Sequence, residues 1–201
     1  MKKQSNTCYS KSEMGFMIWG QNLRSRILMP LLKLIERHNI LPNHITILSM
    51  ISGIVAAFAL LFSPNLAFLL IFVHVTLDGI DGPLARHMNI NSNKGSFIDT
   101  ASDQVVIAFI IFSLIHLKVI SPLSGGIYIL LYTIVVGFAI IRNALKIPYG
   151  WLIRPRFILY IWLPIEFYYL NGSTTFLLWF FNILLATKTI TGFLKICSVT
   201  K

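Results

Sequence analysis

Acidic residues are scarce in this sequence: seven of its 201 residues are Asp or Glu, against 17 Lys and Arg. Charged residues together make up 12% of the chain, about half the share of an ordinary soluble domain, which argues against that class. Cysteine is almost absent too. Cys8 and Cys197 lie near opposite ends, with no CxxC pattern and no histidine at a ligand spacing. This arrangement argues against a disulfide framework and against a zinc site.

Apolar residues are abundant instead. They make up 56% of the chain, a share that indicates lipid as the solvent of much of the surface. Runs of about 20 apolar residues, the length that crosses a bilayer, predict six membrane-spanning helices. Their approximate ranges are 44–63, 66–86, 96–116, 124–145, 155–170 and 174–195. The predicted fold class is therefore an all-α polytopic membrane bundle.

A more polar segment precedes the first span. Polar residues follow the basic start MKK where a signal peptide would be apolar, so we expect an uncleaved N-terminus. Within residues 14–37, apolar residues recur at three- and four-residue steps among basic ones: Leu23, Ile27, Leu31 and Leu34. This spacing predicts an amphipathic helix in the cytoplasmic interface, kinked or divided at Pro30, or else a packing helix with solvated charges. We expect an N-terminal segment, 1–42, and a six-helix transmembrane catalytic domain, 43–201.

The basic residues are unevenly distributed along the predicted spans. All but Lys118 fall before the first span, near the C-terminal end, or around the connections after spans two and four. By the positive-inside rule, both termini and these connections are cytoplasmic. The net charge of +10 is then explained by an anionic membrane surface rather than by nucleic acid. We therefore expect an integral protein of a cell inner membrane or an equivalent membrane.

Four of the seven acids gather in the stretch LDGIDGPLARHMNINSNKGSFIDTASDQ, residues 77–104: Asp78, Asp81, Asp99 and Asp103. Spacings of three and four residues place each pair on one helix face, and a short connection makes the two helices antiparallel neighbours. Four carboxylates at membrane depth would repel one another. Because oxygen ligands favour hard cations, the cluster predicts two divalent ions, Mg²⁺ or Mn²⁺. The alternative is that the acids cap helix ends or pair with Arg86 and Lys94.

The acids belong to a longer pattern, D-x2-D-G-x2-A-R-x8-G-x3-D-x3-D. Its fixed positions are Asp78, Asp81, Gly82, Ala85, Arg86, Gly95, Asp99 and Asp103. This pattern resembles the signature of the CDP-alcohol phosphotransferase (CDP-alcohol phosphatidyltransferase) family, whose members make phospholipids by displacing CMP from a CDP-linked donor. The predicted layout and the entry to the first span, LPNHIT, are also similar to those of the family.

The resemblance implies a role for each residue of the pattern. Two divalent cations would be held by Asp78, Asp81, Asp99 and Asp103. Asp103 would also be the catalytic general base, and Arg86 would support the carboxylates or the phosphates. The cytidine nucleotide would lie against small residues, Gly82, Ala85 and Gly95. The implied reaction, in a homodimer at the cytoplasmic face, transfers a phosphatidyl group from CDP-diacylglycerol to a small polar alcohol and releases CMP.

Basic residues near the fourth and fifth spans bear on the acceptor alcohol: Arg142, Lys146, Arg154 and Arg156. Arginine forks suit phosphate, so these residues predict a phosphorylated acceptor such as glycerol 3-phosphate or inositol phosphate. The stretch IIRNALK faintly resembles that of glycerol-phosphate-using relatives, although Gly150 stands where their second arginine falls. Alternatively, the charges only fix topology.

Two further polar residues lie inside predicted spans. His74, one turn before Asp78, is either a neighbour of the metal ligands or a hydrogen-bonded packing residue. Glu166 is either functional, as intramembrane acids are by default, or a partner of a basic residue such as Arg142. The remaining aromatic residues of note are predicted interfacial anchors: Tyr149, Trp151, Tyr168, Tyr169 and Trp179.

Two other functions compete with the enzyme. A cation transporter or channel would use the acid cluster as an ion site, but polar residues should then continue across the bilayer, whereas the acids lie at one end of the predicted spans. An inactive relative acting as a scaffold would have lost a residue of the pattern, and none is missing. We therefore expect a metal-dependent phosphotransferase.

Overall fold

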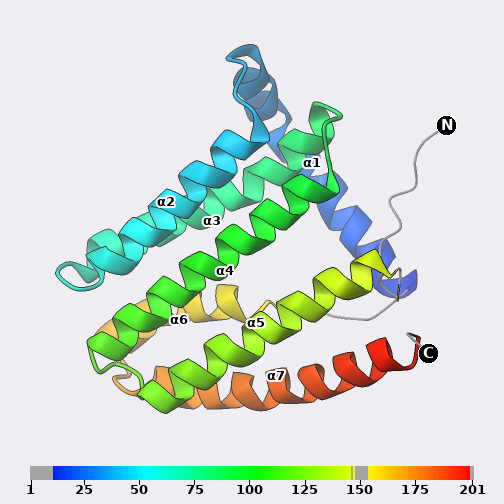
Figure 1. Cartoon of the computed structure of the whole chain (residues 1–201). Helices are drawn as coiled ribbons and strands as arrows, with labels where there is room; N and C mark the ends of the chain where they lie inside the picture. Colours follow the sequence, from blue (N-terminus) through cyan, green and yellow to red (C-terminus); the bar gives the residue numbers. More distant parts are fainter. Residues whose placement is uncertain (1–10, 146, 148–153, 200–201) are drawn as a thin grey trace.

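The computed structural model of the chain describes residues 11–145, 147 and 154–199. Within these residues it contains seven helices and no strand (Figure 1). In chain order they are α1 Lys11–Arg37, α2 Pro42–Ala59, α3 Pro64–His87, α4 Asn93–His116, α5 Pro122–Ala144, α6 Pro155–Tyr168 and α7 Ser173–Cys197. Five of them, α2, α3, α4, α5 and α7, are long and apolar enough to cross a membrane. The expected all-α polytopic membrane fold is confirmed.

The sixth predicted span differs from the other five. Where the sequence predicts a span over 155–170, α6 has 14 residues, which rise about 21 Å and fall short of a hydrocarbon core of about 30 Å. It ends before Gly172, whose φ of 87° lies in the left-handed region that favours glycine. The count of six full-length spans is therefore not confirmed.

Proline and serine mark the helix starts. Proline stands at the first position of α2, α3, α5 and α6, where its missing N–H costs no intrahelical hydrogen bond. Serine side chains accept hydrogen bonds at the starts of α3 and α4, from Leu66 N to Ser63 Oγ and from Gly95 N to Ser92 Oγ. The helices α2 to α6 therefore start within three residues of the predicted spans.

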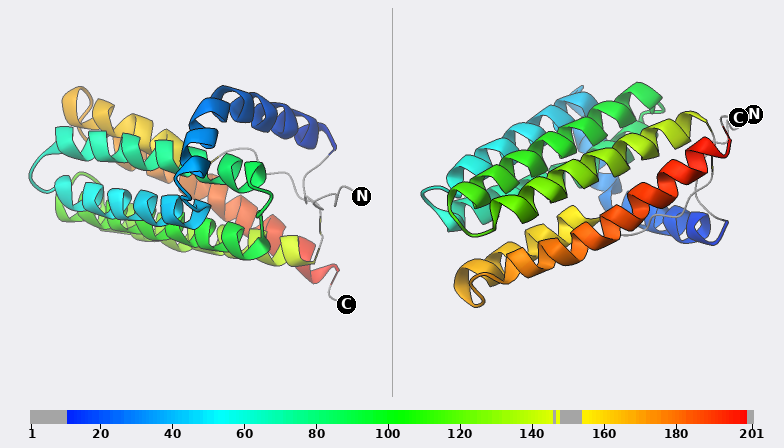
Figure 2. Two further views of the ribbon diagram at one scale, coloured as in Figure 1. Left: turned by 90° about the horizontal axis from the view of Figure 1, so that it is seen from above. Right: turned by 60° about the horizontal axis from the view of Figure 1, so that its bottom comes forward.

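Small residues let α2 pack closely on its neighbours. Ala56, Ala57 and Ala59 are fully buried, and a Cβ placed at Gly53 would lie 2.5 Å from Cγ1 of Val106 on α4. Such small-residue contacts are the usual way in which membrane helices approach each other. Figure 2 shows α2, α3, α4 and α5 running lengthwise together, with α7 alongside and α1 lying across the outside of α3.

The helix α1 packs on α3 while keeping an exposed apolar face. Leu32 is 1% exposed and contributes to a small second core with Ile80 of α3, and Glu36 Oε2 lies 2.9 Å from His87 Nε2. Ile27 is 68% exposed. The helix continues through Pro30, so the division that the proline predicted does not occur.

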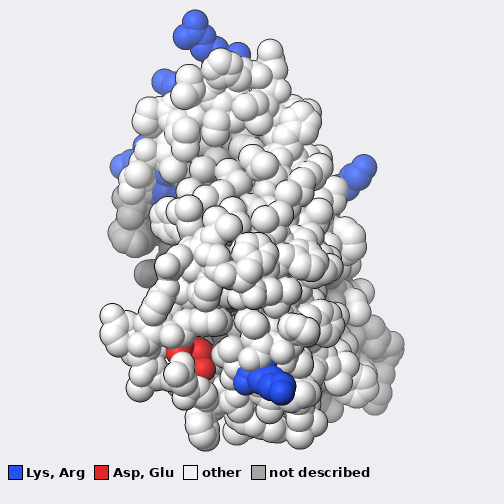
Figure 3. Space-filling model, turned by 90° about the vertical axis from the view of Figure 1, so that its left-hand side faces the viewer, with Lys and Arg blue, Asp and Glu red and all other residues white. Residues whose placement is uncertain are grey.

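The connections α2–α3, α4–α5 and α6–α7 lie at one end of the molecule, on the left of Figure 1. Figure 3 shows this end face on, and few charged side chains are visible there. The basic residues of the sequence belong mainly to the other end, where α3 meets α4 and where the C-terminus lies. That this charged end is cytoplasmic stays a prediction from the positive-inside rule.

Candidate active site

The four predicted acids form one cluster between α3 and α4, in the part of the two helices from their middle toward their connection. The connection between these helices, residues 88–92, is only five residues long, so the helices are antiparallel neighbours. One carboxylate oxygen from each of Asp78, Asp99 and Asp103 lies within 4.8 Å of the others. Asp99 is also within hydrogen-bonding distance of Asp78 and of Asp81. The three- and four-residue spacings thus bring the acids together as predicted.

Asp81 is held by a residue of another helix. Thr46 of α2 donates a hydrogen bond from Oγ1 to Asp81 Oδ2 at 2.7 Å, and both residues are 6% exposed. The bond fixes the direction of one carboxylate and ties α2 to the α3–α4 pair. The sequence did not identify Thr46 as a site residue, although it belongs to the LPNHIT stretch.

Arg156 is the positive charge inside the cluster. Its Nη2 lies 3.2 Å from Asp78 Oδ2, and its Nη1 contacts Asp103 Oδ2. The Arg156 side chain is 5% exposed, against 10% for that of Asp78 and 13% for that of Asp103. The acids therefore pair with an arginine from α6 rather than with the two basic residues nearest in sequence. A charge buried in this way is more than a topology signal.

The other residues of the pattern lie beside the acids. A Cβ at Gly79 would meet nothing within 4 Å, and one at Gly82 would first meet Arg86 Nη1 at 3.6 Å. Arg86 is exposed and Ala85 is half-buried, so this side of α3 is open to a ligand. Gly95 lies at the start of α4, where a Cβ would be 3.4 Å from Ser92 Oγ.

The other predicted acceptor residues are less close to the acids. Arg154 is exposed and precedes α6. Arg142 is 5% exposed and packs against α7, where a Cβ at Gly192 would lie 2.9 Å from Arg142 Nη1. Lys146, like the predicted anchors Tyr149 and Trp151, lies outside the described residues. Of the four, the described contacts bring Arg156 to the cluster.

His74 is a hydrogen-bonded packing residue in this structure. It is 2% exposed, and its Nδ1 lies 2.8 Å from Ser49 Oγ and 3.0 Å from Ser49 O. Its ring meets that of Tyr160 edge to face, with 5.9 Å between the centroids. These contacts support the packing role over a position beside the metal ligands.

Glu166 serves the start of α7. Its carboxylate accepts hydrogen bonds from the backbone N–H groups of Gly172 and Thr174 and from the hydroxyls of Ser173 and Thr174. These partners lie at the α6–α7 turn, whereas Arg142 is in the last turn of α5, which ends at the opposite end of the bundle (Figure 1). The described contacts therefore assign Glu166 a capping role in place of the suggested pairing.

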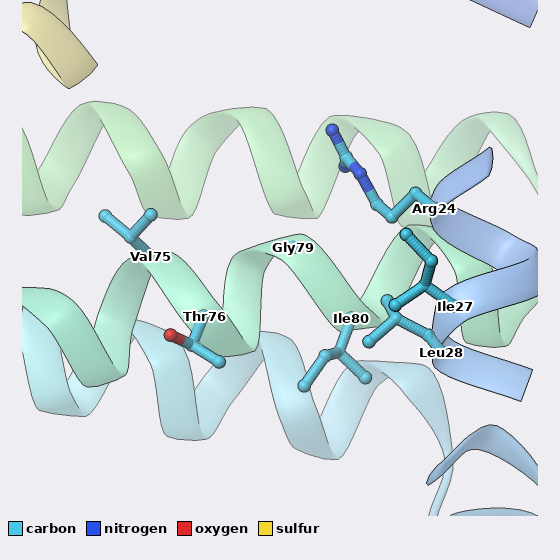
Figure 4. A pocket seen from close by; sticks show the side chains of 7 residues that line it. All are labelled: Arg24, Ile27, Leu28, Val75, Thr76, Gly79 and Ile80. Carbon is cyan, nitrogen blue, oxygen red and sulfur yellow. The ribbon is translucent and has the colours of Figure 1, made fainter. Parts of the chain in front are cut away.

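A groove lies between α1 and α3, next to the acid cluster. Figure 4 shows its lining, Arg24, Ile27, Leu28, Val75, Thr76, Gly79 and Ile80. Its volume is about 330 Å³. The Arg24 side chain lies at the same end of the groove as Ile27, Leu28 and Ile80 (Figure 4), and its charge acts on that of Arg86. The groove therefore combines apolar walls with a positive end.

The donor atoms of the cluster suit a hard divalent cation. They are carboxylate oxygens only, from Asp78, Asp99 and Asp103, with Asp81 beside them, and Mg²⁺ and Mn²⁺ prefer oxygen ligands. No softer ligand, neither sulfur nor imidazole, belongs to this group of residues. The residues present thus fit the predicted metal ions.

The family model described as CDP-alcohol phosphatidyltransferase matches residues 39–194. The chain belongs to this family. The match includes every fixed position of the acid-rich pattern, and it does not favour the transporter alternative. It begins just after the end of α1, so that whole helix lies outside the part that matches the CDP-alcohol phosphatidyltransferase model.

Individual family members are similar over part of their length. The CDP-diacylglycerol–serine O-phosphatidyltransferase of Mycobacterium tuberculosis is 34% identical over 110 residues, 53% of this chain and 38% of that protein. The chloroplastic CDP-diacylglycerol–glycerol-3-phosphate 3-phosphatidyltransferase 1 of Oryza sativa subsp. japonica is 31% identical over 120 residues, which are 58% of this chain and 36% of that protein. The bifunctional IPC transferase and DIPP synthase of Aquifex aeolicus is 35% identical over 78 residues, which are 38% of this chain and 18% of that protein. The matched stretch thus spans less than two fifths of these CDP-alcohol phosphatidyltransferase relatives.

Proposed function

We propose that the protein transfers a phosphatidyl group from CDP-diacylglycerol to the hydroxyl of a small polar alcohol and releases CMP. The observation that carries this proposal is the gathering of Asp78, Asp81, Asp99 and Asp103 between α3 and α4, from the middle of the two helices toward their connection. An enzyme with a lipid donor and a polar acceptor needs its site between the lipid and the water, because acyl chains remain in the bilayer while the nucleotide and the alcohol come from water.

Each side chain then has a chemical task. Asp78, Asp81, Asp99 and Asp103 would hold two divalent cations. Such cations, when bound, neutralise the diphosphate and the charge that develops on CMP. Asp103 accepts the proton of the incoming hydroxyl, whose oxygen attacks the phosphorus that bears the lipid. Thr46 keeps the Asp81 carboxylate in place during these steps.

The nucleotide lies along the open side of α3 and the start of α4. Gly82, Ala85 and Gly95 leave room for it because their own side chains are small, and the nearest neighbour of Gly82 is the exposed Arg86 side chain. Arg86 supports the phosphates or the carboxylates. The acyl chains of the donor occupy the groove between α1 and α3, whose apolar walls suit hydrocarbon and whose positive end, with Arg24, suits the diphosphate.

The acceptor carries an anionic group in this proposal. Arg156 lies beside Asp103, which places a planar guanidinium next to the proposed base, and such a group binds phosphate through two hydrogen bonds. Glycerol 3-phosphate and inositol phosphate are therefore the first acceptors to test. We further propose that residues 43–201 form the catalytic unit, that 1–42 lie at the cytoplasmic interface, and that the protein acts as a homodimer.

The test is CMP release from CDP-diacylglycerol by purified protein, with Mn²⁺, with Mg²⁺ and with a chelator. Acceptors would be glycerol 3-phosphate, inositol phosphate, inositol, serine, choline and phosphatidylglycerol. We expect one acceptor to give a phosphodiester lipid and the chelator to abolish its formation. If no acceptor yields a lipid, the proposal is wrong.

The role of Asp103 has its own test. Asp103→Asn removes the proton acceptor and keeps the side-chain shape, so kcat should fall by about 100-fold or more. Glu36→Gln is the matched control, because Glu36 is an exposed acid that pairs with His87 away from the cluster. If Asp103→Asn retains the full rate, Asp103 is not the base.

A further inference from the structure

Arg156 bridges two carboxylates that the proposed metal ions also need. It contacts Asp78 and Asp103, which are two of the three acids whose oxygens lie within 4.8 Å of one another. Arg156 is 4% exposed and comes from α6, whereas the acids come from α3 and α4. One buried guanidinium therefore uses oxygens from both of the helices that build the metal site.

A guanidinium and a divalent cation cannot share these oxygens without strong repulsion. Both are positive, and the oxygens that they would share lie within 4.8 Å of one another. Repulsion at such a separation is large at a site with little exposure to water. A cation held by Asp78 and Asp103 therefore requires Arg156 to give up at least one of them.

Arg156 has the means to leave the carboxylates. Its Nε is buried and has no hydrogen-bond partner among the described residues, so part of the guanidinium is available to a new acceptor. The group stacks on the ring of Phe157 at 4.7 Å, a contact that supports the cation independently of the acids. Arg156 also lies in the first turn of α6, where Arg154 provides no side-chain cap and backbone N–H groups favour anions.

We propose that Arg156 and divalent cations compete for Asp78 and Asp103, so that cation binding releases Arg156 to bind an anionic group of a substrate. This inference rests on the proposed function. It has a thermodynamic consequence: a cation and an anion must each raise the affinity of the protein for the other. The cation frees Arg156 to bind the anion, and an anion bound to Arg156 frees the carboxylates to bind the cation. The protein would then bind a phosphorylated acceptor well only after its metal ions.

Direct metal binding tests the competition without any turnover. Isothermal titration of the purified protein with Mn²⁺ would compare wild type, Arg156→Gln and Arg156→Lys. We expect Arg156→Gln to bind Mn²⁺ at least tenfold more tightly than wild type, because the competing charge is gone. Arg156→Lys should fall between them, since one ammonium group cannot bridge both carboxylates as a guanidinium does. Arg154→Gln is the matched control for metal affinity, because Arg154 is exposed.

The coupling can be measured in the unaltered protein. Sodium sulfate should raise the Mn²⁺ affinity of wild type several-fold relative to sodium chloride of equal ionic strength. This measurement remains decisive if Arg156→Gln does not fold. In a folded Arg156→Gln protein the sulfate effect should disappear, whereas a merely structural ion pair would leave no sulfate effect in either protein.

Two results would overturn the inference. One is an Arg156→Gln protein whose Mn²⁺ affinity equals or falls below that of wild type, and the other is a wild-type affinity that sulfate does not change. Either result leaves the proposed reaction intact as long as wild type binds Mn²⁺ and releases CMP. If wild type binds neither Mn²⁺ nor Mg²⁺, the metal-dependent function itself fails.

Discussion

Thr46 shows how one residue from a neighbouring helix supports the acid cluster. Its hydroxyl is the hydrogen-bond donor to Asp81 Oδ2, and removing a partner of a metal ligand typically weakens metal binding by 10- to 100-fold. We expect Thr46→Val, which keeps the shape but loses the hydroxyl, to weaken Mn²⁺ binding by about tenfold. Isothermal titration measures the change.

Thr46→Ser is the matched control, because it keeps the hydroxyl and removes a methyl group. It should bind Mn²⁺ within about threefold of wild type. Equal Mn²⁺ affinity in Thr46→Val and wild type would mean that the hydrogen bond does not support metal binding at Asp81.

The acid cluster was predictable from the sequence at the level of single residues, but its partners were only partly so. Spacings of three and four residues put the acids on one face of each helix, and the short connection makes α3 and α4 neighbours. Asp78, Asp99 and Asp103 therefore meet through contacts that are close in sequence. Arg156 lies 53 residues after Asp103 in the chain, and its contact depends on how α6 packs. A signal was present: Arg156 lies on the buried face of α6, at the spacing of an amphipathic helix.

Glu166 links two elements at the end of the bundle away from the acids. Its carboxylate accepts four hydrogen bonds at the start of α7, and a carboxylate at a helix N-terminus is favourable. We expect Glu166→Gln to lower the free energy of unfolding by about 2 kcal/mol, because the charge is lost and the amide offers one acceptor oxygen. Thermal unfolding in detergent would measure it as a fall of several degrees.

Glu36→Gln is the control for this loss of stability. The Glu36 side chain is 49% exposed and pairs with His87, and exposed pairs contribute at most about 1 kcal/mol. Glu166→Gln should also keep its rate of CMP release below the unfolding temperature, since Glu166 lies ten residues after Arg156 in α6, and it is Arg156 that contacts Asp103. A lost rate in a folded Glu166→Gln protein would instead make Glu166 part of the reaction.

If the groove between α1 and α3 holds the acyl chains of the donor, the KM should depend on the groove only for donors with long acyl chains. Val75 is half-buried in its wall, so Val75→Phe should fill part of it and raise the KM for a long-chain CDP-diacylglycerol several-fold. The KM for a water-soluble, short-chain donor should not change, because such a donor does not need the groove. Steady-state CMP release with both donors makes the comparison.

Val73→Phe is the matched control on the same helix. Val73 is 37% exposed and does not line the groove, so the same added volume should leave both KM values unchanged. Equal effects of the two substitutions, or an effect of Val75→Phe on both donors alike, would show that the groove does not hold acyl chains.

At the scale of the molecule, the sequence predicts most of the fold because lipid imposes a simple rule. A helix that crosses a bilayer needs about 20 apolar residues, and five predicted spans have such helices. The rule says less about α6, whose 14 residues lie between Pro155 and the turn at Gly172. The position of α6 is determined by its packing against α3 and α7, and not by a length that matches the bilayer.

Orientation in the membrane is a property of the whole chain, and a native cysteine reports it. Cys197 is free and exposed at the end of α7, on the end of the molecule that carries the basic residues. In a Cys8→Ser protein, a membrane-impermeant maleimide should label Cys197 in inverted vesicles and not in right-side-out vesicles. The physical reason is that all but one of the 17 Lys and Arg would otherwise lie on the side that the positive-inside rule disfavours.

Lys118 provides the opposite marker, because it lies in the α4–α5 connection at the weakly charged end. With both native cysteines replaced by Ser, Lys118→Cys should be labelled only in right-side-out vesicles. If both positions are labelled from one side, the helices between them do not cross the membrane as proposed. If both patterns are reversed, the acid cluster faces away from the cytoplasm. CDP-diacylglycerol would then have to present its nucleotide on the outer side of the membrane.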